Sequence, residues 1–250
     1  MLREAEEGVR YIISWQDHED YPVPDALSQR KDVEIWRCDK KGLSNNRNNA
    51  MSYCKGDIVV IADDDISYAP DFVKRIRRAF GENPDMTIAL FKMDFEVKKI
   101  YPKDNLRLGR RLPKNYYVSS VEICYRREDI GDLKFWEGLG LGSGSMESGE
   151  EAMFVYSAIR RGLQVWFVNE YIGSHPGLTT GNKNKESRLK SEGFVMRMMY
   201  PVSFLWRMPL YSFRMRKDKK GLFFNTLFHL SAGVSCYEKK FKRLPRCYRW

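Results

Sequence analysis

The stretch Gly56-Asp57-Ile58-Val59-Val60-Ile61-Ala62-Asp63-Asp64-Asp65 decides the fold class. Its apolar run, Ile58–Ala62, is short and rich in β-branched residues, which predicts a fully buried strand. The three carboxylates that follow repel one another in the absence of a cation. Ligands of open α/β sheets collect outside the carboxyl ends of the strands, so this cluster favours Mg²⁺ or Mn²⁺ carrying a phosphorylated substrate. The alternative is an Asp-rich turn in which Asp65 caps the next segment.

Strands alternate with helices on both sides of this stretch, which predicts an α/β fold with a mostly parallel sheet. The expected strands are Val9–Ser14, Val33–Arg37, Ile58–Ala62, Met86–Met93, Tyr117–Tyr125 and Val165–Val168, and the expected helices are Leu43–Cys54, Asp71–Phe80 and Gly149–Arg161. The segments Lys98–Lys114 and Ser174–Asn184 are expected to be loops.

The composition limits the kind of partner. The 250 residues carry a net charge of +10, which suits nucleic acid, an anionic membrane surface or an anionic substrate. Nucleic acid is disfavoured, because no recognisable binding motif is present and the charge is distributed along the chain. Five cysteines without a CxxC pair favour a reducing compartment. Residues 1–10 lack the apolar core of a signal peptide, and neither 194–213 nor 222–237 has the character of a transmembrane helix.

Arg47 lies on the same helical stripe as Leu43, Ala50 and Cys54, so its guanidinium is expected to point into the protein. A buried guanidinium needs an anion. That anion is either a structural carboxylate or a diphosphate or nucleobase held near the aspartate cluster. The helical spacing leaves both open.

A second acidic site, Glu150-Glu151, begins the predicted helix Gly149–Arg161. Ser148 and Glu151 match a capping box, which explains one glutamate without catalysis. The preceding Gly-rich loop, Gly138–Gly144, would also let a ligand approach the backbone, and an ionised carboxylate there would suit a general base. Cap and base remain alternatives. His175 follows a predicted strand and is a minor candidate for a metal shell or a phosphate contact.

These residues together resemble the GT-A glycosyltransferases of family 2. The segments that carry the resemblance are Gly42–Ala50, Lys55–Ile58 and Asp63–Asp65, which match the sugar-nucleotide core in its triple-Asp DxD form, then Gly140–Gly142, Gly149–Glu151 and Ser174–Pro176. The match covers about residues 9–180. It implies a Rossmann-like central sheet flanked by helices.

The resemblance also implies a metal-dependent, inverting transfer of a sugar from a nucleotide diphosphate to a hydroxyl. Asp64 would bind Mn²⁺ or Mg²⁺, assisted by Asp65 and His175. Asp63 would lie on the ribose side and Arg47 would hold the nucleotide. Asp17 would contact the base. Gly140 and Gly142 would form part of the acceptor loop, Glu151 would be the catalytic base and Glu150 its substitute.

One departure from the family pattern concerns the start of the chain. Family members open with an apolar strand beside the nucleotide, whereas Val9–Ser14 resembles their second strand. Either the start is truncated or this member lacks that first strand, whose absence would expose hydrogen-bonding edges. An inactive nucleotide-sugar-binding relic is one alternative function. A metal-dependent nucleotidyltransferase is another, although the Gly-rich phosphate loop expected near its first strand is not seen.

We expect a GT-A domain over residues 1–190, with a nucleotide-sugar half at about 9–95 and an acceptor half at about 115–190, and a tail at 191–250. The tail mixes Arg and Lys with aromatic residues and suits either an anionic membrane surface or packing on the sheet or a partner. A lipid-linked or saccharide acceptor in bacterial surface polysaccharide or glycolipid synthesis would place the protein in the cytoplasm, peripheral to the inner face of the plasma membrane.

Overall fold

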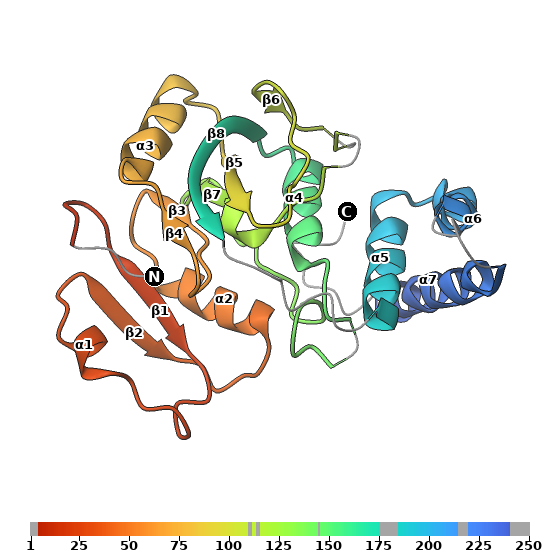
Figure 1. Ribbon diagram of the computed structural model, residues 1–250, viewed down its shortest axis with the longest axis horizontal. Coiled ribbons are helices and arrows are strands. Elements are labelled where there is room, and N and C mark those ends of the chain that lie inside the picture. The colour runs from red at the N-terminus through yellow and green to blue at the C-terminus, as the bar shows by residue number, and fades with distance from the viewer. Residues whose placement is uncertain are drawn as a thin grey trace. The chain divides into compact units, whose positions relative to one another are not determined.

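The structure is a computed structural model that describes residues 5–109, 112–113, 116–144, 146–175, 185–214 and 220–240 (Figure 1). The chain divides into two compact units. The first comprises Met1–Lys41, Asn45–Leu133 and Ala158–Leu178, and the second comprises Gly42–Ser44, Lys134–Ser157 and Thr179–Trp250. The expected division at residue 190 remains a prediction, and part of the Ser174–Asn184 loop lies outside the described residues.

The first unit begins with a small parallel sheet. Strand β1 (Tyr11–Trp15) pairs with β2 (Val33–Arg37) in the register Tyr11↔Val33 to Trp15↔Arg37. The short helix α1 (Asp25–Ser28), which the sequence patterns did not predict, connects them. All five residues of β1 are only half-buried. The correspondence of β1 to the second strand of the family remains a prediction.

A six-stranded sheet forms the centre of this unit. Its order is β3 (Ile58–Val60), β7 (Ile123–Arg126), β5 (Ile88–Phe95), β8 (Val165–His175) and β4 (Ser67–Tyr68), with β6 (Leu106–Arg107) also paired to β8. Strands β3, β5 and β8 run in one direction, and β5 pairs with β8 in parallel. Strand β7 runs against both of its neighbours, and the two-residue strands β4 and β6 run against β8.

The prediction that the Ile58–Ala62 strand is fully buried is wrong. Only Val59 of β3 is buried, whereas Ile58 and Val60 are half-buried and Ala62 is exposed. Within the described residues β3 has a strand partner on one edge, β7, and this limits how much of it is covered. The apolar composition correctly predicted a strand, but how deeply a strand is buried depends on the number of strands paired beside it.

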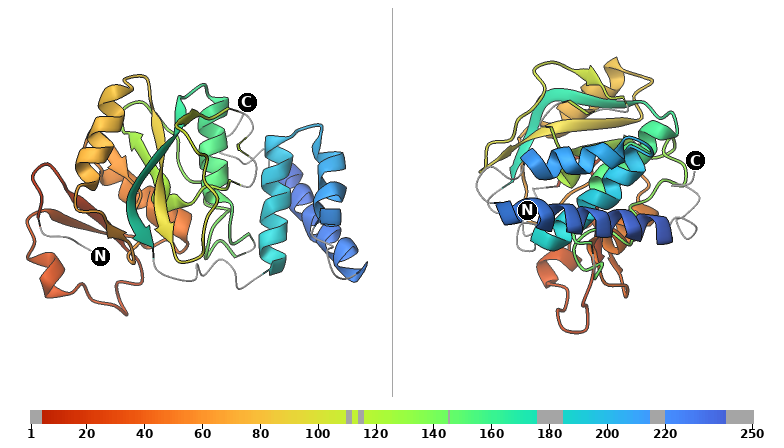
Figure 2. Two further views of the ribbon diagram at one scale, coloured as in Figure 1. Left: turned by 45° about the horizontal axis from the view of Figure 1, so that its top comes forward. Right: turned by 90° about the vertical axis from the view of Figure 1, so that its right-hand side faces the viewer.

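Helix α3 (Phe72–Glu82) lies against the six-stranded sheet (Figure 2). Its buried side chains Phe72, Ile76 and Phe80 recur at spacings of four residues, as one face of a helix requires. They pack on Ala89, Phe91 and Met93 of β5, which share one face of the strand. This core fixes the ends of β5 and β8 and the segment that joins β3 to α3.

The second unit is mainly helical. It contains the start of α2 (Leu43–Tyr53) and most of α4 (Glu150–Arg160), followed by α5 (Lys185–Met199), α6 (Phe204–Arg214) and α7 (Lys220–Lys240) (Figure 2). Helices α5 and α7 touch through their backbones. A Cβ placed on Gly193 would come 2.1 Å from the carbonyl oxygen of Leu230, and one on Gly233 would come 1.9 Å from that of Lys190. Among the described helices, none is long and apolar enough to cross a bilayer.

Candidate functional site

The aspartate cluster lies where β3 ends. The amide of Ile61 still donates to the carbonyl of Ile123 at 3.0 Å, so the chain leaves the sheet just before the cluster. The Asp63 side chain is 31% exposed, whereas Asp64 and Asp65 are exposed. The three carboxylates therefore differ in setting, with Asp63 turned toward the protein and the other two open to ligand or solvent.

Arg47 points into the protein from α2, as its helical stripe predicts, and its side chain is 7% exposed. Its Nη2 donates to the Ser120 hydroxyl at 2.7 Å and to Oδ1 of Asp63 at 3.3 Å. The sequence left open whether Arg47 meets a structural carboxylate or a bound ligand. In the structure it meets the carboxylate of Asp63, a member of the aspartate cluster. Ser120 begins the 3₁₀ helix η1 (Ser120–Glu122), which leads into β7. Three chain segments are joined at this point.

His175 ends β8 and is buried, and its Nε2 lies 3.2 Å from Oδ1 of Asp65. The pairing of β4 with the end of β8, Ser67↔Ser174, explains this contact, because it returns the chain beside His175 two residues after Asp65. The ring leans on Phe95, with centroids 5.6 Å apart. Sequence predicted Val165–Val168 alone as a strand, and the extension to His175 is what places this side chain.

The fit of these residues to a divalent cation can be tested on their donor chemistry. Among the residues that the structure describes, no group of three or more His, Cys, Asp or Glu side chains is arranged to hold a metal ion. However, Mg²⁺ in phosphate-handling sites is held by one or two carboxylates together with water and substrate phosphates. The exposed Asp64 and the neighbouring Asp65 and His175 fit a site that substrate completes.

A buried ion pair beside the site was not predicted. Lys99 Nζ lies 2.5 Å from Oε1 of Glu122, and neither side chain is exposed. Glu122 also accepts from the Tyr101 hydroxyl at 2.6 Å, the Tyr116 hydroxyl at 3.2 Å and the Ser119 amide at 3.1 Å. Burial raises the pKa of Glu122, an effect that the Lys99 ammonium opposes. A glutamate inside an apolar predicted strand was the available signal, but its partner 23 residues away has no sequence pattern.

The Gly-rich loop and the glutamate pair belong to the second unit. Gly142 lies against Gly42, where an added Cβ would come 2.9 Å from the Gly42 Cα, and the Leu43 amide donates to the Leu141 carbonyl at 2.8 Å. A Cβ on Gly140 would come 3.0 Å from Cδ of Glu150. Close packing thus explains both glycines, and their acceptor role remains a prediction.

The two glutamates differ in exposure. Glu150 is buried at 3% exposure, whereas Glu151 is half-buried at the first turn of α4. Of the two, Glu151 is the more exposed; the roles of Glu151 as base and Glu150 as its substitute remain predictions.

Asp17 follows β1 and adopts a left-handed backbone with φ 48°. Its carboxylate lies 3.3 Å from Lys41 Nζ, and its carbonyl accepts from the amides of Asp20 and Tyr21. The loop is therefore ordered by its own hydrogen bonds. A contact between Asp17 and a nucleobase remains a prediction.

Known proteins are similar to this chain in part of its sequence and in fold. Residues 14–130 match the family model described as glycosyl transferase family 2. The crystal structure of S. aureus TarS 1–349 superimposes with a TM-score of 0.53 at 14% identity, covering 88% of this chain and 77% of that one. The complex of TarS 1–349 with UDP-GlcNAc gives 0.54 at 12% identity, covering 88% and 78%. A search of curated proteins finds no match.

The fold is therefore the GT-A fold, an α/β architecture, and the predicted fold class is confirmed. Residues 14–130 match the model of glycosyl transferase family 2, so the predicted resemblance to that family is confirmed.

Proposed function

We propose that the protein is an inverting glycosyltransferase that moves a sugar from a nucleotide-diphosphate donor to a hydroxyl acceptor. The observation that most supports this function is the buried Arg47 of α2. Its guanidinium donates to the Ser120 hydroxyl and to the carboxylate of Asp63, which follows the end of β3. A guanidinium already ordered beside exposed carboxylates suits a nucleotide diphosphate. That TarS 1–349 was crystallised with UDP and with UDP-GlcNAc supports a donor of this class.

We assign the donor side to the first unit. Asp64, Asp65 and His175 would hold Mn²⁺ or Mg²⁺, which would supply Lewis-acid stabilisation of the leaving diphosphate. Asp63 would lie on the ribose side and Arg47 would hold the nucleotide. Asp17, ordered by its own loop and beside Lys41, would face the base.

We assign the acceptor side to the start of α4. The Glu151 carboxylate would take the proton of the acceptor hydroxyl while the hydroxyl oxygen forms a bond to the anomeric carbon of the donor sugar. The bond from that carbon to the diphosphate breaks at the same time, and the diphosphate leaves with the electron pair. Glu150, which is buried, would order the loop that holds Gly140. In-line attack inverts the anomeric configuration without a covalent intermediate.

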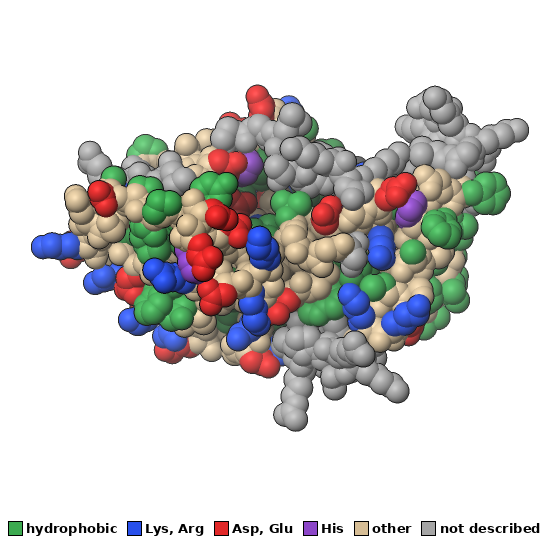
Figure 3. Space-filling view, turned by 90° about the horizontal axis from the view of Figure 1, so that it is seen from below, with side chains coloured by type: hydrophobic (Ala, Val, Ile, Leu, Met, Phe, Trp, Pro, Cys, Tyr) green, Lys and Arg blue, Asp and Glu red, His purple; other side chains and the backbone are tan. Residues whose placement is uncertain are grey.

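The helical part of the second unit supports a peripheral membrane location. Large exposed apolar side chains lie on and just before α6 and on α7: Val202, Leu205, Trp206, Leu210, Phe213, Phe224 and Phe228. Figure 3 shows hydrophobic side chains beside Lys and Arg side chains at its right-hand end. Helix α6 carries Arg207 and Arg214 and no acidic residue. This composition suits the headgroup region of an anionic bilayer.

Such a location would bring a lipid-linked or saccharide acceptor to the enzyme in bacterial surface polysaccharide or glycolipid synthesis, at the cytoplasmic side of the plasma membrane. Flotation with phosphatidylcholine vesicles, with and without phosphatidylglycerol, tests it. We expect binding to the anionic vesicles only, lost in the Trp206→Ser/Leu210→Ser variant and kept in Val97→Ser, which changes a similarly exposed apolar residue of the first unit. Absence of vesicle binding by the wild type would refute the membrane location and leave the transfer reaction standing.

The donor assignment is tested by thermal shift with UDP, GDP, CDP and their sugars, each with and without Mn²⁺. One nucleotide class should stabilise the protein, and Mn²⁺ should increase the stabilisation. No stabilisation by any of them would count against the proposed function. Stabilisation without sugar transfer or hydrolysis, unchanged in Glu151→Gln, would favour the inactive relic. Incorporation of a nucleotide into product would favour the nucleotidyltransferase.

A further inference from the structure

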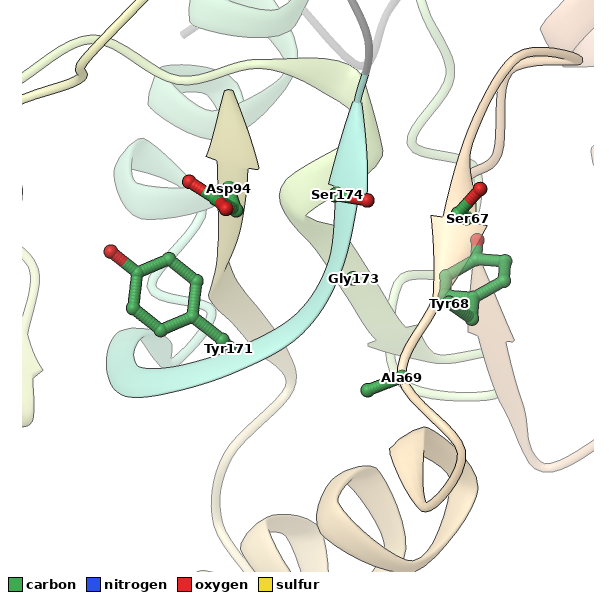
Figure 4. A pocket seen from close by; sticks show the side chains of 7 residues that line it. All are labelled: Ser67, Tyr68, Ala69, Asp94, Tyr171, Gly173 and Ser174. Atoms are coloured by element: carbon green, nitrogen blue, oxygen red, sulfur yellow. The ribbon is translucent and has the colours of Figure 1, made fainter. Parts of the chain in front are cut away.

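An open pocket of about 540 Å³ lies at the edge of the six-stranded sheet in the first unit. It is lined by Ser67, Tyr68 and Ala69 from β4 and the residue after it, by Asp94 from β5, and by Tyr171, Gly173 and Ser174 from β8 (Figure 4). Its size falls within the range of about 300–1,000 Å³ that is usual for small-molecule sites. None of the roles assigned above uses these seven residues.

Three polar side chains form a row across the pocket. Ser174 is the register partner of Asp94 on β5 and of Ser67 on β4. Partners in register share one face of a sheet, so the two hydroxyls and the carboxylate point the same way. Figure 4 shows them on three neighbouring strands. The row therefore presents several hydrogen-bonding atoms to one bound molecule.

An aromatic ring borders this row. Tyr171 is 43% exposed and is the register partner of Lys92, whose Nζ lies 4.0 Å from the ring centroid. Lys92 precedes Asp94 by two residues, so the two side chains leave β5 on the same face. Lys92 therefore lies over one face of the Tyr171 ring, and the exposed remainder of the ring borders the hydroxyls of Ser174 and Ser67 and the carboxylate of Asp94.

The chemistry of the lining selects the ligand. None of the seven lining residues carries a positive charge and Asp94 is acidic, so the lining itself does not favour a phosphate or carboxylate. Lys92, on the same face, is held by the Tyr171 ring and the Asn169 side chain. A carboxylate and two hydroxyls can together accept and donate several hydrogen bonds. A flat neutral molecule with many hydroxyls and an apolar face would use both the row and the Tyr171 ring. A sugar ring has these properties.

The pocket is separate from the proposed donor site. The next register pair, Phe95↔His175, points to the opposite face of the sheet, so His175 and its partner Asp65 are not in the row. A donor sugar is tied to the diphosphate that Asp65 and His175 are proposed to hold. We therefore propose, on the basis of the proposed function, that the pocket is a subsite for a sugar ring of the saccharide acceptor.

Saturation-transfer NMR on the full chain tests this subsite without donor or metal. The probes are the methyl glycosides of glucose, galactose, mannose, rhamnose and N-acetylglucosamine. At least one should bind, and its affinity should fall about tenfold in Asp94→Asn, which loses a hydrogen bond to a charged acceptor. Tyr171→Ala should lose binding and Tyr171→Phe should keep it. Asp85→Asn, an exposed aspartate before β5, is the matched control and should bind as the wild type does.

Two results would overturn the subsite: no glycoside of this panel binds, or a bound glycoside is unaffected by both Asp94→Asn and Tyr171→Ala. Nucleotide stabilisation is measured in parallel on the same variants and should be unchanged. Glycoside binding through Asp94 in a protein that binds no nucleotide would refute the proposed transfer and leave the saccharide subsite. Nucleotide binding without glycoside binding would refute the saccharide subsite and leave the proposed transfer standing.

Discussion

The Lys99 ammonium and the Glu122 carboxylate form a fully buried ion pair, 2.5 Å apart, two residues from Ser120. Lys99 also donates to the Ser119 hydroxyl at 3.0 Å, and its Nζ lies 4.2 Å from the Tyr117 ring centroid. The pair therefore fixes the start of η1. By fixing η1, the ion pair also fixes Ser120, whose hydroxyl accepts a hydrogen bond from Arg47.

Removal of one partner of this pair should be costly. Lys99→Met leaves the Glu122 carboxylate buried without its cation, and we expect the free energy of unfolding to fall by about 3–5 kcal/mol. Urea denaturation measures the loss. The double variant Lys99→Met/Glu122→Met should lose less than the two single variants added together, since no lone charge is then buried. Strict additivity would mean that the two groups do not interact.

Arg47 should act on the nucleotide more than on stability. Arg47→Lys keeps the charge but replaces the planar guanidinium, which can bind a diphosphate in bidentate fashion, with a single ammonium group. We expect nucleotide affinity, measured by calorimetry, to fall about tenfold. Ser120→Ala removes only the hydroxyl to which Arg47 donates, so its nucleotide affinity should fall less. Equal affinities in wild type and Arg47→Lys would show that Arg47 serves only to pair with Asp63.

Substitutions of the two glutamates at the start of α4 should have different effects on the rate of the reaction. Glu151→Gln removes the proposed base, and kcat should fall about 10²–10⁴-fold while nucleotide stabilisation is retained. Glu150→Gln keeps the shape of a side chain buried against Gly140, so it should alter stability more than rate. The reverse pattern, with the rate lost only in Glu150→Gln, would exchange the two roles.

Chelation should weaken donor binding. If Asp65 and His175 hold the cation with the diphosphate, EDTA should remove most of the stabilisation by the matching nucleotide. His175→Gln should then need more Mn²⁺ for half of the wild-type shift, because one ligand is lost. Titration of Mn²⁺ at fixed nucleotide measures this. An identical Mn²⁺ dependence in the variant would remove His175 from the metal shell.

The contact of α5 with α7 depends on two glycines. Gly233→Ala places a methyl group 1.9 Å from the Lys190 carbonyl oxygen, so the helices must separate. We expect a destabilisation of about 2–4 kcal/mol from the lost packing of the second unit, seen in chemical denaturation. Gly81→Ala is the matched control, since nothing lies within 4 Å of its added Cβ, and in a helix it should stabilise by about 1 kcal/mol. A neutral Gly233→Ala would contradict the close contact.

Local patterns carried most of the element assignment. Val33–Arg37 was predicted with its observed bounds, and the helices around Arg47, Phe72 and Glu150 were predicted to within two residues at each end. Spacing along one helix also predicted that Arg47 points inward, because helical geometry relates positions three and four apart without reference to the rest of the chain. The short strands β4 and β6 were missed, since two residues carry no periodicity.

The sequence by itself determined the α/β class, the acid cluster after β3, and the resemblance to glycosyl transferase family 2, because strand and helix periods and a contiguous motif are local properties. Only the tertiary structure decided that Arg47 meets Asp63, that His175 meets Asp65, that Lys99 is buried on Glu122, and that Asp94, Ser174 and Ser67 form one row. Each of these contacts joins residues far apart in the chain. Strand register and packing set them, and no spacing in a single sequence encodes a register between distant strands.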